Sequence, residues 1–138
     1  MVQQHTLSIN TQGRGTQELT YDINQWLKNC DIQVGTCTIF VMHTSASLML
    51  CENADPDVRH DMETFMSNLV PDGDPMFIHT AEGEDDMPAH VRSVLTHNSI
   101  TVPVNNSRLV LGTWQGVYLW EHRTAPHTRK IVLTLMGE

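Results

Sequence analysis

The last third of the chain alternates short apolar segments with polar or glycine-containing turns, and this pattern constrains the fold most strongly. Four such segments follow one another: Ile100–Val104, Leu109–Leu111, Trp114–Trp120 and Lys130–Met136. Segments this short and closely spaced are joined by hairpins, so they predict antiparallel strands and argue against a βαβ repeat. Pro103 cannot donate a hydrogen bond to a neighbouring strand, so its strand is expected at a sheet edge or a bulge.

Further strands are expected in the first part of the chain. Alternating or β-branched patterns mark residues 2–10, Val34–Met42 and Ala46–Cys51. Between the first two, Thr16 is expected to cap a helix that follows a Gly13–Gly15 turn. Its apolar residues recur at helical spacing and are expected to pack in the core: Leu19, Ile23, Trp26 and Leu27.

Two more helices are expected in the middle of the chain. Asp55 followed by Pro56 is a strong helix start, and this second helix is expected to end near Val70, before a turn. A third helix is expected from Asp86 or Met87, because a carboxylate and a following proline suit a helix N-terminus. The first two thirds of the chain therefore mix helices with strands.

The chain is long enough for one hydrophobic core and too short for two. Of its 138 residues, 40% are hydrophobic and 17% are charged, which is ordinary for a globular domain. We therefore expect a single α+β domain over residues 1–138, with about three helices and a mostly antiparallel β core.

The formal net charge of −8 bears on the class of partner. Duplex nucleic acid and anionic membrane surfaces are bound through clustered lysines and arginines, so neither is expected as a partner. A phosphorylated ligand would need local positive charge from a metal ion, a helix N-terminus or a few arginines.

The sequence predicts neither export nor membrane insertion. The first residues lack the basic start and apolar stretch of a secretory signal, and no run of roughly 18 apolar residues occurs. Cys30, Cys37 and Cys51 are odd in number and lack CxxC spacing, so we expect reduced thiols and no thiolate zinc site. A soluble, cytoplasmic protein is therefore expected.

Position divides the eight histidines into two groups. Four lie where a solvated or capping role is expected: His5, His60, His97 and His127. The others stand beside polar or acidic segments. His43 ends an apolar strand, and His79 precedes an acidic loop. His90 lies early in the third helix, and His122 lies at a strand end. Divalent metals bind neutral imidazoles, usually with carboxylates nearby. The spacing is no HExxH-type signature, so separate, satisfied histidines remain an alternative.

The acidic loop Glu82–Asp86 precedes the third helix. Gly83 within it allows positive φ, so the backbone can approach a ligand or metal closely while the carboxylates converge. The alternative is a solvated turn that caps the helix.

Arginines and hydroxyls accompany the second group of histidines. Arg123 and Arg129 flank the last turn and are the expected phosphate contacts, because a guanidinium forms bidentate hydrogen bonds with phosphate. Surface ion pairing is the alternative for both. Thr44 and Ser45 add hydroxyls beside His43.

Five motifs follow one another across nearly the whole chain. They are His43-Thr44-Ser45-Ala46-Ser47-Leu48, the stretch Glu52–Arg59, Glu82-Gly83 with Asp85–His90, Gly112-Thr113-Trp114-Gln115-Gly116, and Glu121-His122-Arg123 with the terminal Gly137-Glu138. Their order and separations resemble the YjbQ-like family, also described as the secondary thiamine-phosphate synthase family. Two places depart from its pattern: Cys51 stands where asparagine is usual, and Ala125-Pro126-His127 replaces a Gly-Gly turn.

The resemblance implies an α+β fold with a twisted, sandwich-like β core, and a homotrimer whose sites lie near subunit boundaries. It also implies a weak thiamine-phosphate synthase activity. That reaction joins hydroxymethylpyrimidine diphosphate to a thiazole phosphate with loss of pyrophosphate. The partner so implied is a small phosphorylated metabolite.

The resemblance and the residue chemistry together suggest a role for each of these positions. In this interpretation His43, His79 and His90 hold a divalent metal, with zinc expected and magnesium as an alternative for the diphosphate. Four residues are expected to act in catalysis: Glu82, Asp85, Asp86 and His122. Four are expected to contact substrate or phosphate: Thr44, Ser45, Arg123 and Arg129. The metal and arginines would neutralise charge on the leaving diphosphate.

Two other classes of function stay open on the sequence alone. A metal-dependent hydrolase of a small phosphorylated or lactone metabolite would release product from a single substrate. A non-catalytic trimeric binding protein would be stabilised by its ligand and would form no product.

Overall fold

Three helices and two antiparallel sheets make up the computed structural model, which describes residues 1–138, and this is the α+β architecture that the sequence predicts. The five-stranded sheet has the order β1-β8-β3-β5-β6, and the three-stranded sheet has the order β2-β7-β4. The strands are β1 Val2–Asn10, β2 Gly15–Glu18, β3 Gly35–Val41, β4 Ala46–Glu52, β5 Ser99–Asn105, β6 Arg108–Leu109, β7 Gln115–Glu121 and β8 Thr128–Gly137. The helices are α1 Thr20–Lys28, α2 Pro56–Leu69 and α3 Asp86–Leu95.

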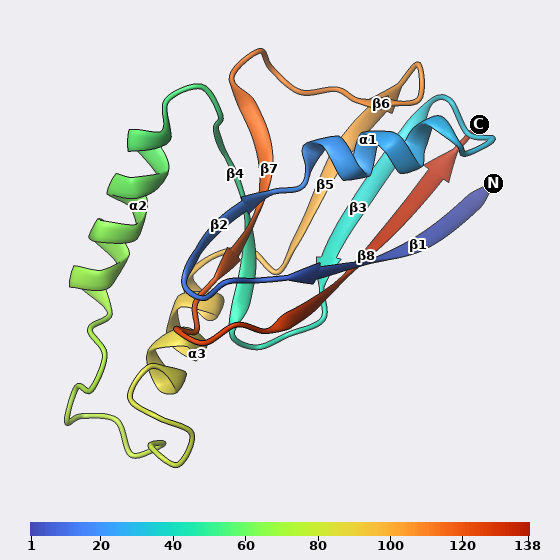
Figure 1. The fold of residues 1–138 in the computed structure, drawn as a ribbon. Coiled ribbons are helices and arrows are strands. Elements are labelled where there is room, and N and C mark those ends of the chain that lie inside the picture. The colour runs from blue at the N-terminus through green and yellow to red at the C-terminus, as the bar shows by residue number, and fades with distance from the viewer.

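The two ends of the chain lie close together (Figure 1). They meet because β1 and β8 pair antiparallel along their length, from Val2 opposite Met136 to Asn10 opposite Thr128. The first and last strands are therefore neighbours in the five-stranded sheet, with β1 at its edge.

The main core lies between the two sheets and under α1. Ile23 and Leu27 of α1 are fully buried in it, as is Leu19 just before the helix, and all three were expected there. Side chains of β7 alternate between its two faces, as a strand requires. Leu119 faces the main core, whereas Trp120 belongs to a second cluster that includes Met66 of α2. The three-stranded sheet is therefore covered on both faces.

The first helix begins later than the sequence predicts. Thr16 lies in β2, which pairs with β7 from Gly15 opposite Glu121 to Glu18 opposite Tyr118. The expectation that Thr16 caps a helix is therefore wrong. A distant strand, which local periodicity does not reveal, provides the hydrogen-bonding partners of this segment.

The expected start of α2 is confirmed. Asp55 is the N-cap residue, its side chain accepts a hydrogen bond from the backbone N–H of Asp57, and Pro56 occupies the first helical position. Only Met66 of the helix is buried, however, and Phe65 is 62% exposed. In Figure 1, α2 stands beside β4 at the margin of the β core. Much of its apolar surface therefore faces outward.

Two further expectations are confirmed. Pro103 lies in β5, whose outer neighbour β6 pairs only with Val104 and Asn105, so most of β5 is a sheet edge. All three cysteines are free thiols. None of the helices combines the length and the hydropathy that a membrane crossing requires.

Candidate metal centre

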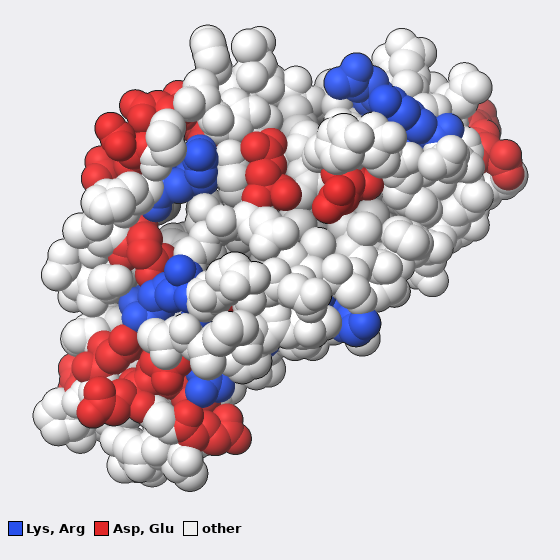
Figure 2. All heavy atoms as spheres, in the orientation of Figure 1, with Lys and Arg blue, Asp and Glu red and all other residues white.

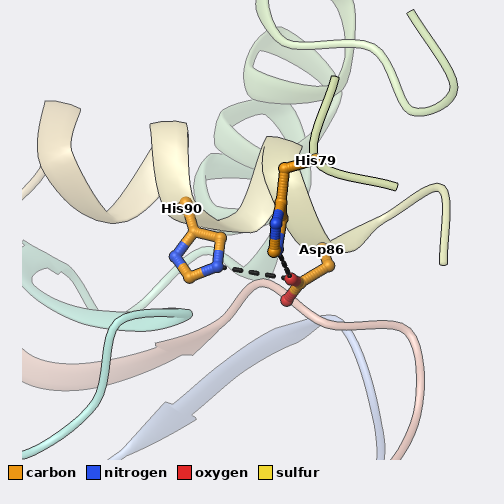
Figure 3. A group of neighbouring side chains, drawn as sticks. All are labelled: His79, Asp86 and His90. Carbon is orange, nitrogen blue, oxygen red and sulfur yellow. Dashed lines mark hydrogen bonds and ion pairs between the residues drawn. The ribbon is translucent and has the colours of Figure 1, made fainter. Parts of the chain in front are cut away.

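Two histidines and a carboxylate converge at the start of α3 (Figure 3). Nε2 of His79 lies 2.7 Å from Oδ2 of Asp86, and Nε2 of His90 lies 3.3 Å from the same oxygen. The two imidazole rings meet edge to face, with centroids 5.4 Å apart. One ligand atom from each residue lies within 4.8 Å of the others. These are the groups that bind zinc and related divalent metals.

The helix places two of these groups, and the preceding connection places the third. Asp86 and His90 stand at i and i+4 in α3, so their side chains lie on one face, a turn apart. His79 comes from the long connection between α2 and α3. Ligand atoms of a tetrahedral zinc ion with bonds of about 2.0–2.1 Å lie roughly 3.3 Å apart. The separation between His90 and Asp86 already fits such a site.

The carboxylate of Asp86 is buried but ionised. Burial alone would raise the pKa of Asp86, but the hydrogen bond with His79 and the charge of Arg123 hold this pKa below its ordinary value. Asp86 is therefore in its metal-ligating form at neutral pH, and its neighbours fix its orientation.

Arg123, just beyond β7, holds the acidic loop against α3. Its Nε donates to Oδ2 of Asp85 at 3.0 Å, its Nη2 donates to the carbonyl oxygen of Glu82 at 2.9 Å, and its Nη1 lies 2.9 Å from Oδ1 of Asp86. Burial alone would raise the pKa of Asp85, but the backbone N–H of Thr124 and the guanidinium of Arg123 lower it to about 2. Arg123 is therefore a positioning residue that orients Asp86.

The turn that precedes α3 differs in detail from the sequence expectation. Gly83 has a φ of +108°, which confirms the need for glycine there. Asp85, rather than Asp86 or Met87, occupies the N-cap position, and its side chain makes no capping bond. Glu82 uses its carbonyl oxygen to bind Arg123, while its side chain is exposed. Of the expected acids, Asp86 alone faces both imidazoles.

His43 is placed apart from the other two expected metal ligands. It follows β3, and its Nε2 accepts a hydrogen bond from the backbone N–H of Lys130 in β8 at 2.8 Å. The structure thus brings together two of the three expected imidazoles, His79 and His90, with Asp86 as the third group. The sequence could not show this because the partner of His43 is a distant backbone group.

A cavity of about 200 Å³ joins His43 to the cluster. Its lining consists of His43, Thr44, His90, Ser93, Val94 and Asn98. His90 therefore belongs both to the three-residue cluster and to the wall of this cavity. Thr44 has the exposed position that its expected contact with substrate requires.

His122 is enclosed in the protein interior. The ring has no exposed surface, and its Nε2 lies 2.7 Å from Oγ of Ser47. Burial, together with the charge of the nearby Arg92, lowers the pKa of His122 to about 3. The ring is therefore neutral at pH 7 and out of contact with any external ligand, which argues against the catalytic role expected for it.

Arg129 forms an internal ion pair. Its Nε donates to Oε1 of Glu121 at 2.8 Å, and its Nη2 donates to Oγ of Ser45 at 2.9 Å and to the second carboxylate oxygen of Glu121. Arg129 is 4% exposed and Glu121 is 1% exposed. Arg129 and Ser45, both expected to contact phosphate, are therefore buried and bonded to each other inside the fold.

Sequence reasoning missed several polar residues near the site. Ser93 stands three residues after His90 in α3, so the helical spacing could have revealed it. Asn98 follows the helix and gives no local signal. Glu63 of α2 also escaped notice, although it binds Arg92 at 2.9 Å and Nε1 of Trp120 at 2.7 Å. It ties α2 to the rest of the molecule.

The surface around this centre carries most of the visible charge. Figure 2 shows Asp and Glu side chains gathered over the end of the molecule that holds α2, α3 and their connection, with Lys and Arg side chains among them. Arg14 belongs to such a pairing, because it binds Asp72 in the connection at 2.7 Å. The arginines there hold acidic segments in place.

Comparison with known proteins places this chain in a family. The family model described as UPF0047 protein YjbQ-like matches residues 5–138. A UPF0047 protein of Synechocystis is 48% identical over 135 residues, which cover 98% of this chain and 92% of the relative. The UPF0047 protein YjbQ of Escherichia coli O157:H7 is 43% identical over 136 residues, 98% of each chain.

A solved structure has the same fold as this chain. The crystal structure of a conserved hypothetical protein from Thermus thermophilus matches with a TM-score of 0.86 and 30% identity, and covers 96% of this chain and 99% of that one. The fold is therefore that of a YjbQ-like α+β domain. The chain belongs to the UPF0047 family of YjbQ-like proteins.

Proposed function

We propose that His79, Asp86 and His90 hold a divalent metal ion, with zinc as the expected one. The observation that supports this is the convergence of two imidazole nitrogens and an ionised carboxylate, with Arg123 orienting the carboxylate. Three protein ligands leave a coordination position open, as in catalytic rather than structural zinc sites. Magnesium suits this donor set less well, because it favours oxygen ligands over imidazole.

The proposed reaction is the synthesis of thiamine phosphate from hydroxymethylpyrimidine diphosphate and a thiazole phosphate. The thiazole nitrogen attacks the methylene carbon of the pyrimidine, the bond from that carbon to the diphosphate oxygen breaks, and pyrophosphate leaves with the electron pair. A bound divalent metal supplies Lewis-acid neutralisation of the leaving diphosphate. The residues support this reaction through the coordination position that the three ligands leave open for a substrate. The choice of substrates follows the resemblance to the secondary thiamine-phosphate synthases.

The protein's own residues have supporting roles in this proposal. Asp86 keeps its charge because Arg123 and His79 lower its pKa. Arg123 fixes the position of the acidic loop Glu82–Asp86 by binding the carboxylate of Asp85 and the carbonyl oxygen of Glu82. No protein nucleophile is needed, because the thiazole nitrogen forms the new bond.

The test is an assay of both products. Zinc-loaded protein is incubated with the two substrates, and thiamine phosphate and pyrophosphate are measured. We expect the two products to form in equal amounts. His90→Ala is expected to lose this activity, and His60→Ala, at an exposed position of α2, is the matched control. Pyrophosphate released without the thiazole substrate would identify a hydrolase instead. Product formation that His90→Ala leaves unchanged would contradict the proposed site.

We also propose that the chain assembles as a homotrimer, as the resemblance implies. The support is the number of large apolar side chains that one chain leaves exposed, among them Phe40, Met42, Phe65, Leu69, Val94 and Leu95. Apolar surface marks a protein interface where such side chains adjoin one another, as Phe65 and Leu69 do at one turn's spacing on α2. Val94 and Leu95 lie on α3, the helix that carries Asp86 and His90.

A further inference from the structure

The backbone of β8 holds His43 in one tautomer. The N–H of Lys130 donates to Nε2 at 2.8 Å, and a backbone amide can only donate, so Nε2 carries no proton. A neutral imidazole then carries its proton on Nδ1. Burial, with the charge of Arg129, holds the pKa of His43 below its ordinary value. The ring is therefore neutral at pH 7, with a bare Nε2 and an Nδ1–H.

In this tautomer the one lone pair that could bind a metal ion, on Nε2, is not free. Nε2 already uses its lone pair to accept from Lys130, and Nδ1 is a donor. Coordination through Nε2 would break the bond to the strand, and coordination through Nδ1 would require an imidazolate. The hydrogen-bonding group that His43 can present to a ligand is Nδ1–H.

The cavity that His43 shares with His90 has no charged side chain in its lining. Besides the two imidazoles its lining holds Thr44, Val94, Asn98 and Ser93, whose hydroxyl donates to the carbonyl oxygen of Ala46. No lysine, arginine or carboxylate lines it. A lining of this kind binds neutral hydrogen-bonding groups, because an anion would find no balancing charge. Its volume of about 200 Å³ exceeds the roughly 150 Å³ of an engineered cavity that binds benzene. One six-membered ring therefore fits.

We propose that this cavity receives an uncharged, ring-sized group of the ligand, and that His43 donates its Nδ1 proton to an acceptor atom of that group. The acceptor is a ring nitrogen or a carbonyl oxygen, so the ligand class is a neutral heterocycle that carries a charged phosphoryl end. The inference rests on the proposed function, because it places the charged end at the cluster of His79, Asp86 and His90. His90 joins the two parts of the site.

The first experiment measures the tautomer directly. Two-bond proton–nitrogen correlation spectra of uniformly ¹⁵N-labelled protein show which ring nitrogen carries the proton, and His43→Gln assigns the signals of that ring. We expect His43 to show a protonated Nδ1 and a bare Nε2 both before and after zinc is added, while the rings of His79 and His90 change. Signals of His43 that take the metal-bound pattern would overturn the inference. Zinc that alters none of the three rings would overturn the proposed function instead.

The second experiment measures ligand affinity with a matched pair of variants on zinc-loaded protein. Asparagine at position 43 places an amide N–H near the position of Nδ1, whereas glutamine places its amide near that of Nε2. The probes are the uncharged hydroxymethylpyrimidine and inorganic pyrophosphate. We expect His43→Gln to bind the pyrimidine about 3- to 10-fold more weakly, and His43→Asn within about 2-fold of the original protein.

The controls separate this inference from the metal proposal. Pyrophosphate affinity and zinc content are expected to stay unchanged in both variants, and His60→Gln is expected to behave as the original protein does. Equal pyrimidine affinity in His43→Gln and the original protein would overturn the inference. Loss of zinc from the His43 variants would do the same, because it would make His43 a metal ligand.

Discussion

Nη1 of Arg123 lies 2.9 Å from Oδ1 of Asp86 and so connects the segment after β7 to the first residue of α3. Through this contact a residue that need not touch the metal controls one of its ligands. Partners of this kind fix the orientation of ligating carboxylates, and their loss typically lowers metal affinity by about 10- to 100-fold. We predict a loss of that size for Arg123→Ala, measured by competition for zinc with a chelating dye.

The matched control for that variant is Arg108→Ala, since Arg108 is exposed on β6. Its zinc affinity is expected to equal that of the original protein. If Arg123→Ala also bound zinc with unchanged affinity, Asp86 would be oriented without Arg123, and the proposed positioning role of Arg123 would be wrong.

Burial of His122 predicts a specific dependence of stability on pH. Its pKa in the folded protein is lowered to about 3, whereas an exposed histidine in the unfolded chain has a pKa of about 6.5. Between these values the unfolded chain binds a proton that the folded protein does not. The contribution is therefore fully present above about pH 6.5 and is lost as the pH falls toward 3.

His122 is expected to contribute a slope of about 1.4 kcal/mol per pH unit to the free energy of unfolding near pH 5, because the unfolded chain binds one more proton there. Urea unfolding at pH 5 and pH 6 measures it in the original protein and in His122→Gln, which keeps a polar partner for Ser47. The variant is expected to show a shallower slope over this interval. Equal slopes in both proteins would mean that His122 does not titrate in the unfolding equilibrium.

The ion pair between Glu121 and Arg129 is expected to be costly to break. Arg129→Met would leave a carboxylate that is 1% exposed without its guanidinium. Loss of one partner of a buried pair typically costs about 3–5 kcal/mol. Urea unfolding at pH 7 checks this, with Arg108→Met as the control, for which a change within about 0.5 kcal/mol is expected. A similar small change for Arg129→Met would show that water reaches Glu121.

The exposed apolar residues of α2 predict a variant that separates assembly from folding. Phe65 is 62% exposed in one chain, so a charge there costs little in the monomer but is buried without a partner in an interface. Phe65→Glu is expected to sediment as a smaller species than the trimer, with the far-ultraviolet circular dichroism of the original protein. His60→Glu on the same helix is expected to remain trimeric. A trimer of Phe65→Glu, with unchanged stability, would place the interface elsewhere.

Local sequence patterns predicted correctly those helices and strands whose caps or apolar alternation lie within the element itself. Asp55 and Pro56 marked the start of α2 because a cap and a proline act within one turn. The strands of the last third also fall where alternation placed them, within a few residues. The prediction that Thr16 caps a helix was wrong because Thr16 lies in β2, which pairs with β7 about a hundred residues away. No local pattern indicates that pairing.

The candidate site was predictable to the extent that its groups lie near one another in sequence. His79, Asp86 and His90 all belong to the connection before α3 and its first turns. The sequence indicates all three as site residues, although it predicts Asp86 as a catalytic residue and not as a metal ligand. The state of His43 was not predictable, since its Nε2 meets a backbone N–H of β8. The burial of Arg129 follows likewise from Glu121 and Ser45, which reach it only in the folded sheets.

The most direct test of this account is a crystal of the zinc-loaded protein, measured on both sides of the zinc absorption edge. We predict one anomalous peak per chain, about 2.0–2.2 Å from a carboxylate oxygen of Asp86, Nε2 of His90 and Nε2 of His79, where zinc displaces the proton that the ring donates to Asp86. His43 is expected to stay bound to the N–H of Lys130. Zinc found away from these three residues, or no zinc at all, would contradict the metal centre on which the proposed function depends.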